Sequence, residues 1–449
     1  MDIQLLLQSL QQKIEQLEAR IKILEAENAL LRNKKNSNNS GIPPSQDENR
    51  PKKNQSLREK SDKKVGGQPG HEGTTLSFSG VVDELIKHSP TICTNCGTNL
   101  TSMPEVLLSH RKVIDIPPIA LKCTEHQLYQ KQCRCGCVVQ GNYPVNVTSS
   151  LQYGHNIEAL VSYLHARQYV PYQRMGEFLK DVMNLPISQG SIYNMLQRMA
   201  SKATPMYKVI KEKLAQATYI GTDETGININ GQKYWSWVWQ NHHLTYIVCA
   251  VSRGIQTIKE HFTNGLPSAV LVHDRWAAHF NMDVKAHQIC TAHLLRDLNY
   301  INQLYENKCQ WATGFKQLLL DAITLKKTLT ENDYYRPNPQ KKILFKQLEN
   351  LLFYQVEKEH EKSTTLQKSL LAKQECILYF LLQHNVPPDN NGSERAIRNI
   401  KVKQKISGQF KTIEAANAFA ILRSVIDTTI KSGLNVFDQL KLIANLRAE

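Results

Sequence analysis

The sequence predicts a mixed α/β core that carries a helical insertion. An N-terminal coiled coil, a small cysteine-rich β unit and a helical region are predicted to precede this core. Three observations support this fold class: a heptad repeat at the N-terminus, short β-branched and aromatic runs from about residue 217, and helical periodicity over most of the chain from Ala286 onward.

The composition indicates a folded protein with an anionic partner. The 449 residues are 41% hydrophobic, and 55 Lys and Arg residues outnumber 40 Asp and Glu residues to give a net charge of +15. Such a surplus favours binding to nucleic acid or to an anionic membrane surface. No apolar run reaches the roughly 18 residues of a spanning helix, which excludes a membrane-embedded protein. Because the N-terminus lacks a secretory signal, the ten cysteines are expected to be thiols or metal ligands in a cytoplasmic protein.

Residues 1–32 carry the heptad repeat of a two-stranded coiled coil. The a positions are Leu7, Ile14, Ile21 and Asn28, and the d positions are Ile3, Leu10, Leu17, Leu24 and Leu31. Isoleucine at a with leucine at d favours a parallel dimer, and one asparagine at a fixes its register. We therefore predict a homodimer or a higher oligomer through this segment. A single helix packed on its own protein is the alternative.

Two segments beside the cysteine-rich unit are predicted to meet DNA. Residues 33–78 are polar and basic, which suits either a flexible arm that grips phosphates or a solvated tether. Residues 151–215 have helical periodicity, and Ser188 can cap the last helix after a short turn. Two helices joined in this way resemble a helix-turn-helix, although periodicity alone does not separate that motif from an ordinary helical pair.

Residues 79–150 contain two groups of cysteines with metal-ligand spacing. Cys93 and Cys96 form a Cys-x2-Cys pair, and Cys133 and Cys135 form a tighter Cys-x-Cys pair. Two thiol pairs on two turns suit tetrahedral zinc, so we predict a structural Zn²⁺ held by these four residues. Three further residues compete as ligands: Cys137, Cys123 and His126. The alternative is a set of reduced cysteines without metal.

Three acidic residues are predicted to form the chemical site. Asp223 closes the predicted strand TYIGTD, Asp274 closes the predicted strand AVLVHD, and Glu394 opens a helix in PPDNNGSERAIRN. Carboxylates that converge in a cleft repel one another and call for cations, and Mg²⁺ or Mn²⁺ prefers oxygen ligands. Two such ions can support an in-line displacement at phosphorus. Taken singly, each acid would be a surface or capping group, so the prediction depends on the pattern of two strand ends and one helix start.

Basic residues follow the glutamate along the same predicted helix. Arg395, Arg398, Lys401 and Lys403 are predicted to hold a DNA backbone, and a solvated basic face is the alternative. We place the core at residues 216–400, its helical insertion at about 302–385, and a C-terminal helical region at 401–449.

These motifs resemble, in order, those of the insertion sequence sixty-six family of bacterial DDE transposases. The resemblance rests on the leucine-zipper start, the GGQPGHEG linker, the Cys-x2-Cys-Gly knuckle, and the segments TDETG, VHDRWAAH, ICTAHLLRDL and DNNGSERAIRNIK. It covers nearly the whole chain, and the DNN-x2-ER and GGQPGH segments are its most specific parts.

The resemblance implies a ribonuclease-H-like core in which Asp223, Asp274 and Glu394 bind the catalytic metal ions. It implies a bacterial, nucleoid-associated transposase that cuts DNA at the terminal repeats of its element and joins the freed end to target DNA. His293 and Arg296 become candidates for contacting the scissile phosphate or orienting a carboxylate, with packing against the core as the alternative. A catalytically inactive DNA-binding repressor and a nuclease without strand transfer are the competing functions.

Overall fold

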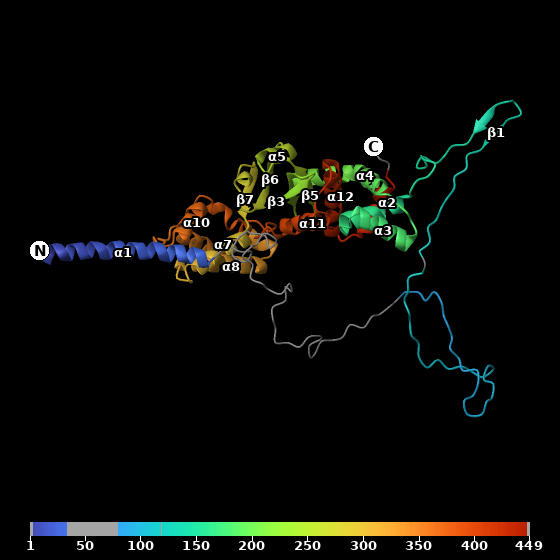
Figure 1. The fold of residues 1–449 in the computed structure, drawn as a ribbon, viewed down its shortest axis with the longest axis horizontal. Helices are drawn as coiled ribbons and strands as arrows, with labels where there is room; N and C mark the ends of the chain where they lie inside the picture. The colour runs from blue at the N-terminus through green and yellow to red at the C-terminus, as the bar shows by residue number, and fades with distance from the viewer. Residues whose placement is uncertain (1–2, 34–79, 118, 447–449) are drawn as a thin grey trace. The chain divides into compact units, whose positions relative to one another are not determined.

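The computed structural model describes residues 3–33, 80–117 and 119–446 (Figure 1). Residues 80–117, 119 and 120 belong to one compact unit, and the other described residues belong to a second. Apart from Asn33, the linker predicted at 33–78 lies outside the described residues. No described helix combines the length and the apolar character that a membrane crossing requires.

The N-terminal segment forms one long helix, α1 (Ile3–Arg32), as the heptad repeat predicts. All a and d side chains whose burial is described are exposed, among them Leu10, Leu17 and Leu31. The apolar stripe of α1 is therefore open along the described part of the helix. An exposed stripe of this kind is what a coiled-coil partner covers.

The second unit is built on a five-stranded sheet in the order β5-β4-β3-β6-β7. The strands are β3 (Tyr219–Ile229), β4 (Gln232–Gln240), β5 (Thr245–Ala250), β6 (Leu266–His273) and β7 (Val284–Ile289). Strands β3, β4 and β5 form the predicted antiparallel meander, and β6 pairs in parallel with β3 as the predicted further strand. The fifth strand, β7, pairs in parallel with β6.

Two predictions about these strands are wrong. Strand β3 does not end at Asp223 but continues to Ile229, because β4 pairs with it residue by residue up to the Asn230–Gly231 turn. Both turn residues adopt positive φ, as two-residue hairpin turns require. The region from Ala286 is predicted to be helical, but its first residues belong to strand β7. The sequence of β7, VKAHQI, is too short and too polar to stand out as a strand.

Alternate residues of the central strands enter two separate hydrophobic cores. Ile220 of β3 and Leu271 of β6 belong to one core, whereas Tyr219, Val270 and Val272 belong to the other. Because the side chains of a strand alternate between the faces of the sheet, both faces are covered.

Different helices contribute to the two cores (Figure 1). The helices of the first core are α2 (His155–Ser162), the π-helical turn η1 (Tyr163–Arg167), α3 (Tyr172–Met183), α4 (Gln189–Ala215), α11 (Asn391–Ser407), α12 (Ile413–Lys431) and α13 (Val436–Ala444). The insertion helices α7 (Thr291–Leu304), α8 (Gln310–Thr328), α9 (Pro339–Leu352) and α10 (Glu361–Leu371) contribute to the second core. Two short helices, α5 (Ile255–His261) and α6 (Ala277–Phe280), connect strands.

Helix bounds differ from the prediction at two places. The Ser188 hydroxyl caps α4 by accepting from the Ser191 N–H, as predicted, but α4 continues to Ala215 and packs against α12. The helix-turn-helix-like region is therefore part of the packing around the sheet. Helix α11 runs through the domain boundary predicted at residue 400, because its apolar residues Ala396 and Ile400 pack into the first core.

Candidate active site

The two aspartates lie side by side on neighbouring strands. Strands β3 and β6 are parallel, with Gly221 opposite Val272. Two residues further along, the same register brings Asp223 level with Asp274, which directly follows β6. Adjacent strands lie about 4.8 Å apart, so the two side chains start from neighbouring points of the sheet. Asp223 reaches this place from the middle of a strand.

The glutamate comes from the first turn of α11, and polar side chains dock this turn onto β3. Asn390, the residue before the helix, is 2% exposed, and its Nδ2 donates to the carbonyl oxygen of Thr222 at 2.6 Å. The Ser393 hydroxyl donates to Asn390 Oδ1 at 2.7 Å. The residue before Glu394 is thereby tied to the residue before Asp223.

Two glycines allow α11 to approach the sheet closely. A Cβ at Gly221 would lie 2.6 Å from Gln240 Nε2 and 2.7 Å from Asn390 Oδ1. A Cβ at Gly392 would lie 2.5 Å from Gln240 Nε2. Neither position accepts a side chain without a shift of its neighbours. The two glycines therefore allow α11 to pack close enough to β3 to bring Glu394 near the aspartates.

The three carboxylates act on one another electrostatically. Burial raises the pKa of Asp223 well above its usual range, and the charges of Glu224, Asp274 and Glu394 raise it further. The backbone N–H of Glu224, 2.9 Å from Asp223 Oδ1, opposes this shift. Among the described residues, the oxygens of the triad do not all come within 4.8 Å of one another. The triad is thus grouped but not in mutual contact, a spacing that like charges favour.

Three basic side chains surround Glu394. Its Oε1 lies 4.0 Å from His293 Nδ1 and 3.7 Å from Arg296 Nη2, and its Oε2 lies 3.9 Å from Arg398 Nη2. Burial and the charge of Arg296 lower the pKa of His293, although Glu394 and Asp274 oppose the shift. Glu394 Oε1 and His293 Nδ1 are buried and have no hydrogen-bond partner. Such atoms are ready to bind a ligand.

A fourth acid, Glu224, lies beside the triad and is not part of the sequence prediction. Its side chain is 1% exposed and accepts a hydrogen bond from Arg253 Nε at 2.8 Å. His279 Nε2 lies 3.2 Å from Glu224 Oε2 and 3.7 Å from Asp274 Oδ1. Burial alone would raise the pKa of Glu224, but His279 and Arg253 hold it below its usual value. The only sequence signal for this group is a second acid in a buried strand, which demands a partner.

Some of the predicted DNA-contacting side chains on α11 are exposed, and others are bonded within the protein. Arg395 and Arg398 are exposed and line a cavity of about 730 Å³ together with Arg167 and Lys431. Lys401 is only partly exposed, and its Nζ donates to the carbonyl oxygen of Gly226 at 2.7 Å. Lys401 therefore ties α11 to β3.

The structure contradicts the prediction that Lys403 offers its charge to DNA. Lys403 is 4% exposed, its Nζ donates to Ser407 Oγ at 3.0 Å, and the same atom lies 3.4 Å from His165 Nδ1. Burial lowers the pKa of Lys403 to about 8. The physical reason is helical spacing, since residues three and seven positions before Lys403, Ile400 and Ala396, point into the first core.

Both groups of cysteines form tight turns that contain a glycine. Gly97 N–H donates to Cys93 O, and Gly136 N–H donates to Cys133 O, each at 2.9 Å, and both glycines adopt positive φ. The second turn is flanked by the antiparallel strands β1 (Gln130–Gln132) and β2 (Val138–Gln140). The predicted β unit therefore contains two local turns and little other regular structure among its described residues.

The turns lower the pKa of one thiol in each group. Hydrogen bonds with Thr98 and Cys93 lower the pKa of Cys96, and hydrogen bonds with Cys137 and Cys133 lower the pKa of Cys135. A lower pKa favours the thiolate, which is the form that binds zinc. Both turns are thus suited to present metal ligands.

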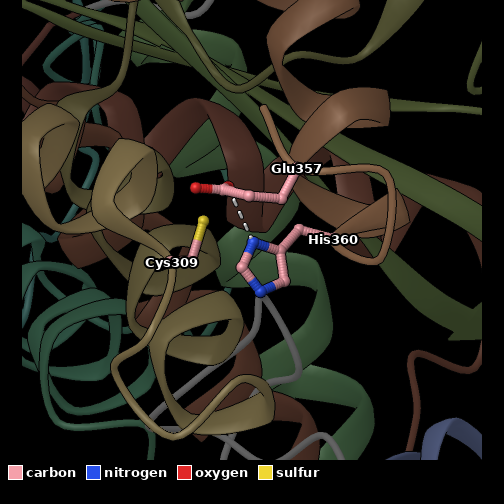
Figure 2. A group of neighbouring side chains, drawn as sticks. All are labelled: Cys309, Glu357 and His360. Carbon is pink, nitrogen blue, oxygen red and sulfur yellow. Dashed lines mark hydrogen bonds and ion pairs between the residues drawn. The ribbon is translucent and has the colours of Figure 1, made fainter. Parts of the chain in front are cut away.

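A further group of metal-ligand residue types lies in the helical insertion. Figure 2 shows Cys309, Glu357 and His360 pointing toward one another, with ligand atoms within 4.8 Å. His360 Nδ1 lies 3.0 Å from Glu357 Oε2, and Cys309 Sγ lies 3.2 Å from Ser363 Oγ. Because each of the three side chains has a protein partner, we assign the group to the packing of the α9–α10 loop on the start of α8.

Comparisons with known families agree with this architecture. The sequence model of the "Transposase IS66 family" matches residues 150–418, which is more than half of the chain. The "zinc-finger binding domain of transposase IS66" matches residues 90–136 and supports a structural zinc in the cysteine segment. A family of unknown function matches residues 1–77. No curated protein gives a match.

These matches define a transposase, a DNA-processing enzyme with a zinc-finger domain and an α/β core. The chain belongs to the IS66 family of transposases, which confirms the resemblance seen in its motifs.

Proposed function

We propose that the chain cuts DNA strands at the ends of its insertion element and joins the freed ends to target DNA. The observation that carries the proposal is the convergence of Asp223, Asp274 and Glu394 from two strands and a helix. The strand order supports a ribonuclease-H-like core, because an antiparallel meander is followed by two strands parallel to its first strand.

The donor set suits hard divalent cations such as Mg²⁺ or Mn²⁺. Burial and neighbouring negative charges raise the pKa of Asp223, and Glu394 Oε1 is buried without a hydrogen-bond partner, so a cation held by the triad would relieve both conditions. When bound, such ions polarise the scissile phosphate and lower the pKa of an attacking water.

Basic residues around Glu394 would hold and orient the DNA. Arg296 and Arg398 place positive charge within 4 Å of the glutamate, where a phosphate would enter. Arg395 and Arg398 border the 730 Å³ cavity and would bind the backbone beside the reacting phosphate. His293, with its lowered pKa, would be neutral and would exchange a hydrogen bond with the phosphate or with Glu394.

The proposed reaction has two steps. Water first hydrolyses a phosphodiester at the transposon end, which leaves a 3′-OH on one strand and a 5′-phosphate on the other product. The 3′-OH then attacks a phosphodiester of target DNA, and the target releases a new 3′-OH. Neither step forms a covalent bond to the protein.

The remaining parts of the chain would assemble the two transposon ends. We propose that Cys93, Cys96, Cys133 and Cys135 hold one structural Zn²⁺, with Cys137, Cys123 and His126 as open alternatives. The zinc unit and the helices α3 and α4 would bind the terminal repeats. The exposed stripe of α1 would pair two protomers and bring two ends into one complex.

A Mg²⁺-dependent cleavage assay on the native element ends tests the proposal. We expect Glu394→Gln to lower the cleavage rate by about a thousandfold in a folded protein, because one metal-binding carboxylate is lost. Glu414→Gln makes the same change at an exposed glutamate in the first turn of α12 and should leave the rate unchanged. Equal activity of Glu394→Gln and wild type would reject the site.

A second assay separates transposition from simpler activities. A pre-cut element end is offered together with a plasmid, and joined product is measured by gel. Joining supports the transposase, cleavage without joining identifies a nuclease, and binding of ends without either reaction identifies a repressor.

A further inference from the structure

Glu224 anchors an arginine between aromatic rings. Arg253 lies in the turn after β5, where its Nε donates to Glu224 Oε1 at 2.8 Å. Its guanidinium carbon lies 3.9 Å from the ring centre of Trp276 and 5.0 Å from that of Trp235. A guanidinium that is stacked on rings and bonded to a carboxylate has little freedom. Glu224 therefore fixes the Trp276 ring through Arg253.

A histidine of the short helix α6 also lies against Glu224. His279 is 0% exposed, and its Nε2 lies 3.2 Å from Glu224 Oε2. The ring meets Trp237 of β4 edge-to-face, with the ring centres 5.7 Å apart. Helix α6 has four residues and forms no part of the sheet, so it depends on side-chain contacts such as these and the packing of Phe280 on His273.

Trp276 and His279 both meet the side chain of Asp274. The backbone N–H of Trp276 donates to Asp274 Oδ1 at 2.9 Å, and His279 Nε2 lies 3.7 Å from the same oxygen. Asp274 follows His273, the last residue of β6 that pairs with β7. The sheet therefore brings Asp274 to the site, but the contacts that lead to Glu224 orient its carboxylate.

We propose that Glu224 is a positioning residue for Asp274. Glu224, Arg253, Trp276 and His279 form a brace, which we call the Glu224 brace, and it aims the Asp274 carboxylate toward Asp223. Because Asp223 and Glu224 are neighbours in β3, one strand sets the positions of both aspartates. The inference rests on the proposed function, in which Asp274 binds a metal ion. Mutation of a residue that supports a metal ligand in this way typically lowers metal affinity by about 10–100-fold.

The variant Glu224→Gln tests the brace, because glutamine keeps the size of the side chain but loses the charge that pairs with Arg253 and lies beside His279. When no divalent cation occupies the active site, we expect amide hydrogen exchange in residues 274–281 to be about tenfold faster in Glu224→Gln than in the wild type. Exchange in β6 should be unchanged. We expect Mn²⁺ binding to the zinc-loaded chain, measured by calorimetry, to weaken about tenfold.

Glu158→Gln is the matched control. Glu158 is also buried and ion-paired, with Arg198 at 2.6 Å and Lys202 at 3.1 Å, but its partners lie on α4. It should leave exchange in residues 274–281 and Mn²⁺ affinity as in the wild type. Trp276→Ala provides a second variant at a partly exposed position and should shift both readouts in the same direction as Glu224→Gln, whereas Trp276→Phe should resemble the wild type because it keeps a ring under Arg253.

Three outcomes decide the matter. Unchanged exchange in residues 274–281 of both Glu224→Gln and Trp276→Ala would overturn the brace. Faster exchange with wild-type Mn²⁺ affinity would overturn its positioning role and leave a structural contact. A wild-type chain that binds no Mn²⁺ would instead count against the proposed function, while the exchange measurement would still report on the brace.

Discussion

The catalytic core and the cysteine segment hold their predicted metal ligands in different ways. In the core, two paired strands place Asp223 and Asp274, and a helix docked by the buried Asn390 places Glu394. In residues 80–150, the two strands have three residues each and nearly every described residue is exposed. The cysteines are placed there by local turns.

This difference indicates which region needs metal for its structure. The core buries large side chains such as Trp237, Trp311 and Phe315, so packing fixes its carboxylates even though their charges repel one another. The cysteine segment buries too little apolar surface to be stable alone and gains from a metal staple. We therefore expect metal removal to stop chemistry in the core but to unfold the cysteine segment.

The largest expected effect is that of Asp223→Asn on the core. Cleavage should fall by about a thousandfold, because a metal ligand is lost. In Mg²⁺-free buffer the variant should nevertheless be more stable than the wild type, with a Tm about 2–4 °C higher, since asparagine removes a carboxylate whose ionisation the folded state opposes. Cleavage kinetics and differential scanning calorimetry measure the two effects.

The stability difference between the wild type and Asp223→Asn should also depend on pH. The folded pKa of Asp223 is raised above its usual 3.8, so the folded state binds the proton more tightly than the unfolded state does. The stability of the Mg²⁺-free wild type should therefore fall, relative to Asp223→Asn, as pH rises from about 4 toward the raised pKa. If Asp223→Asn is less stable than the wild type throughout this range, the ionised Asp223 does not destabilise the metal-free core. The contrast drawn between the core and the cysteine segment would then be wrong.

The second effect concerns the cysteine segment. The double change Cys93→Ser and Cys96→Ser should remove about one zinc per chain and should abolish exchange protection of the turn that includes Gly97. Binding of element ends should weaken at least about tenfold, while the Tm of the core should move by less than about 1 °C. Metal analysis, hydrogen exchange and calorimetry measure these quantities.

Cys309→Ser is the control for the zinc prediction. Cys309 belongs to the group in Figure 2 whose side chains have protein partners, so this variant should keep the wild-type zinc content. Loss of zinc in Cys309→Ser, or a full zinc content in the double variant, would contradict the assignment of the metal to the cysteine segment.

A smaller effect is expected where α11 meets the sheet. Gly221→Ala should destabilise the chain by about 1–3 kcal/mol, because the new Cβ would lie 2.6 Å from Gln240 Nε2 and 2.7 Å from Asn390 Oδ1. It should also slow cleavage, since it pushes Glu394 away from Asp223. Gly226→Ala in the same strand should be tolerated, as its nearest neighbour is Lys233 Cε at 3.7 Å. Equal stability of the two variants would show that α11 is not held by close approach.

Local patterns predicted much of this fold. The heptads predict α1, the alternating aromatic and β-branched runs predict β3 to β6, and the capping residue Ser188 predicts the start of α4. The same patterns indicate Asp274 and Glu394, because the end of β6 and the start of α11 present side chains at predictable places. These features depend on residues that are close in sequence.

The missed features depend on contacts between distant segments. Asp223 lies in mid-strand because β4 extends the hairpin past it, and β7 exists because β6 offers a parallel edge. The partner of Glu224 is Arg253, which only the tertiary fold brings near. Strand pairing and tertiary packing determine the position of Asp223, the presence of β7 and the partner of Glu224. No local pattern of residue types specifies these three features.

The smallest expected effect compares two cations of α11. The Arg398 side chain is 73% exposed near Glu394, so Arg398→Gln should weaken DNA binding by about threefold to tenfold and reduce the salt dependence of binding by about one counterion. Lys403→Met should leave both quantities unchanged, because the Lys403 ammonium is bonded to Ser407 inside the protein. Fluorescence anisotropy with labelled element ends at several salt concentrations measures both variants.

The stability of Lys403→Met provides an independent check. The folded pKa of Lys403 is lowered to about 8 from 10.5, so the unfolded state binds the proton more tightly between these values. The stability of the wild type should therefore rise relative to Lys403→Met as pH increases from about 8 to 10.5. A pH-independent difference, or DNA affinity that falls in Lys403→Met as it does in Arg398→Gln, would mean that this side chain is solvated and open to DNA, and the division of α11 into an exposed and a buried basic face would fail.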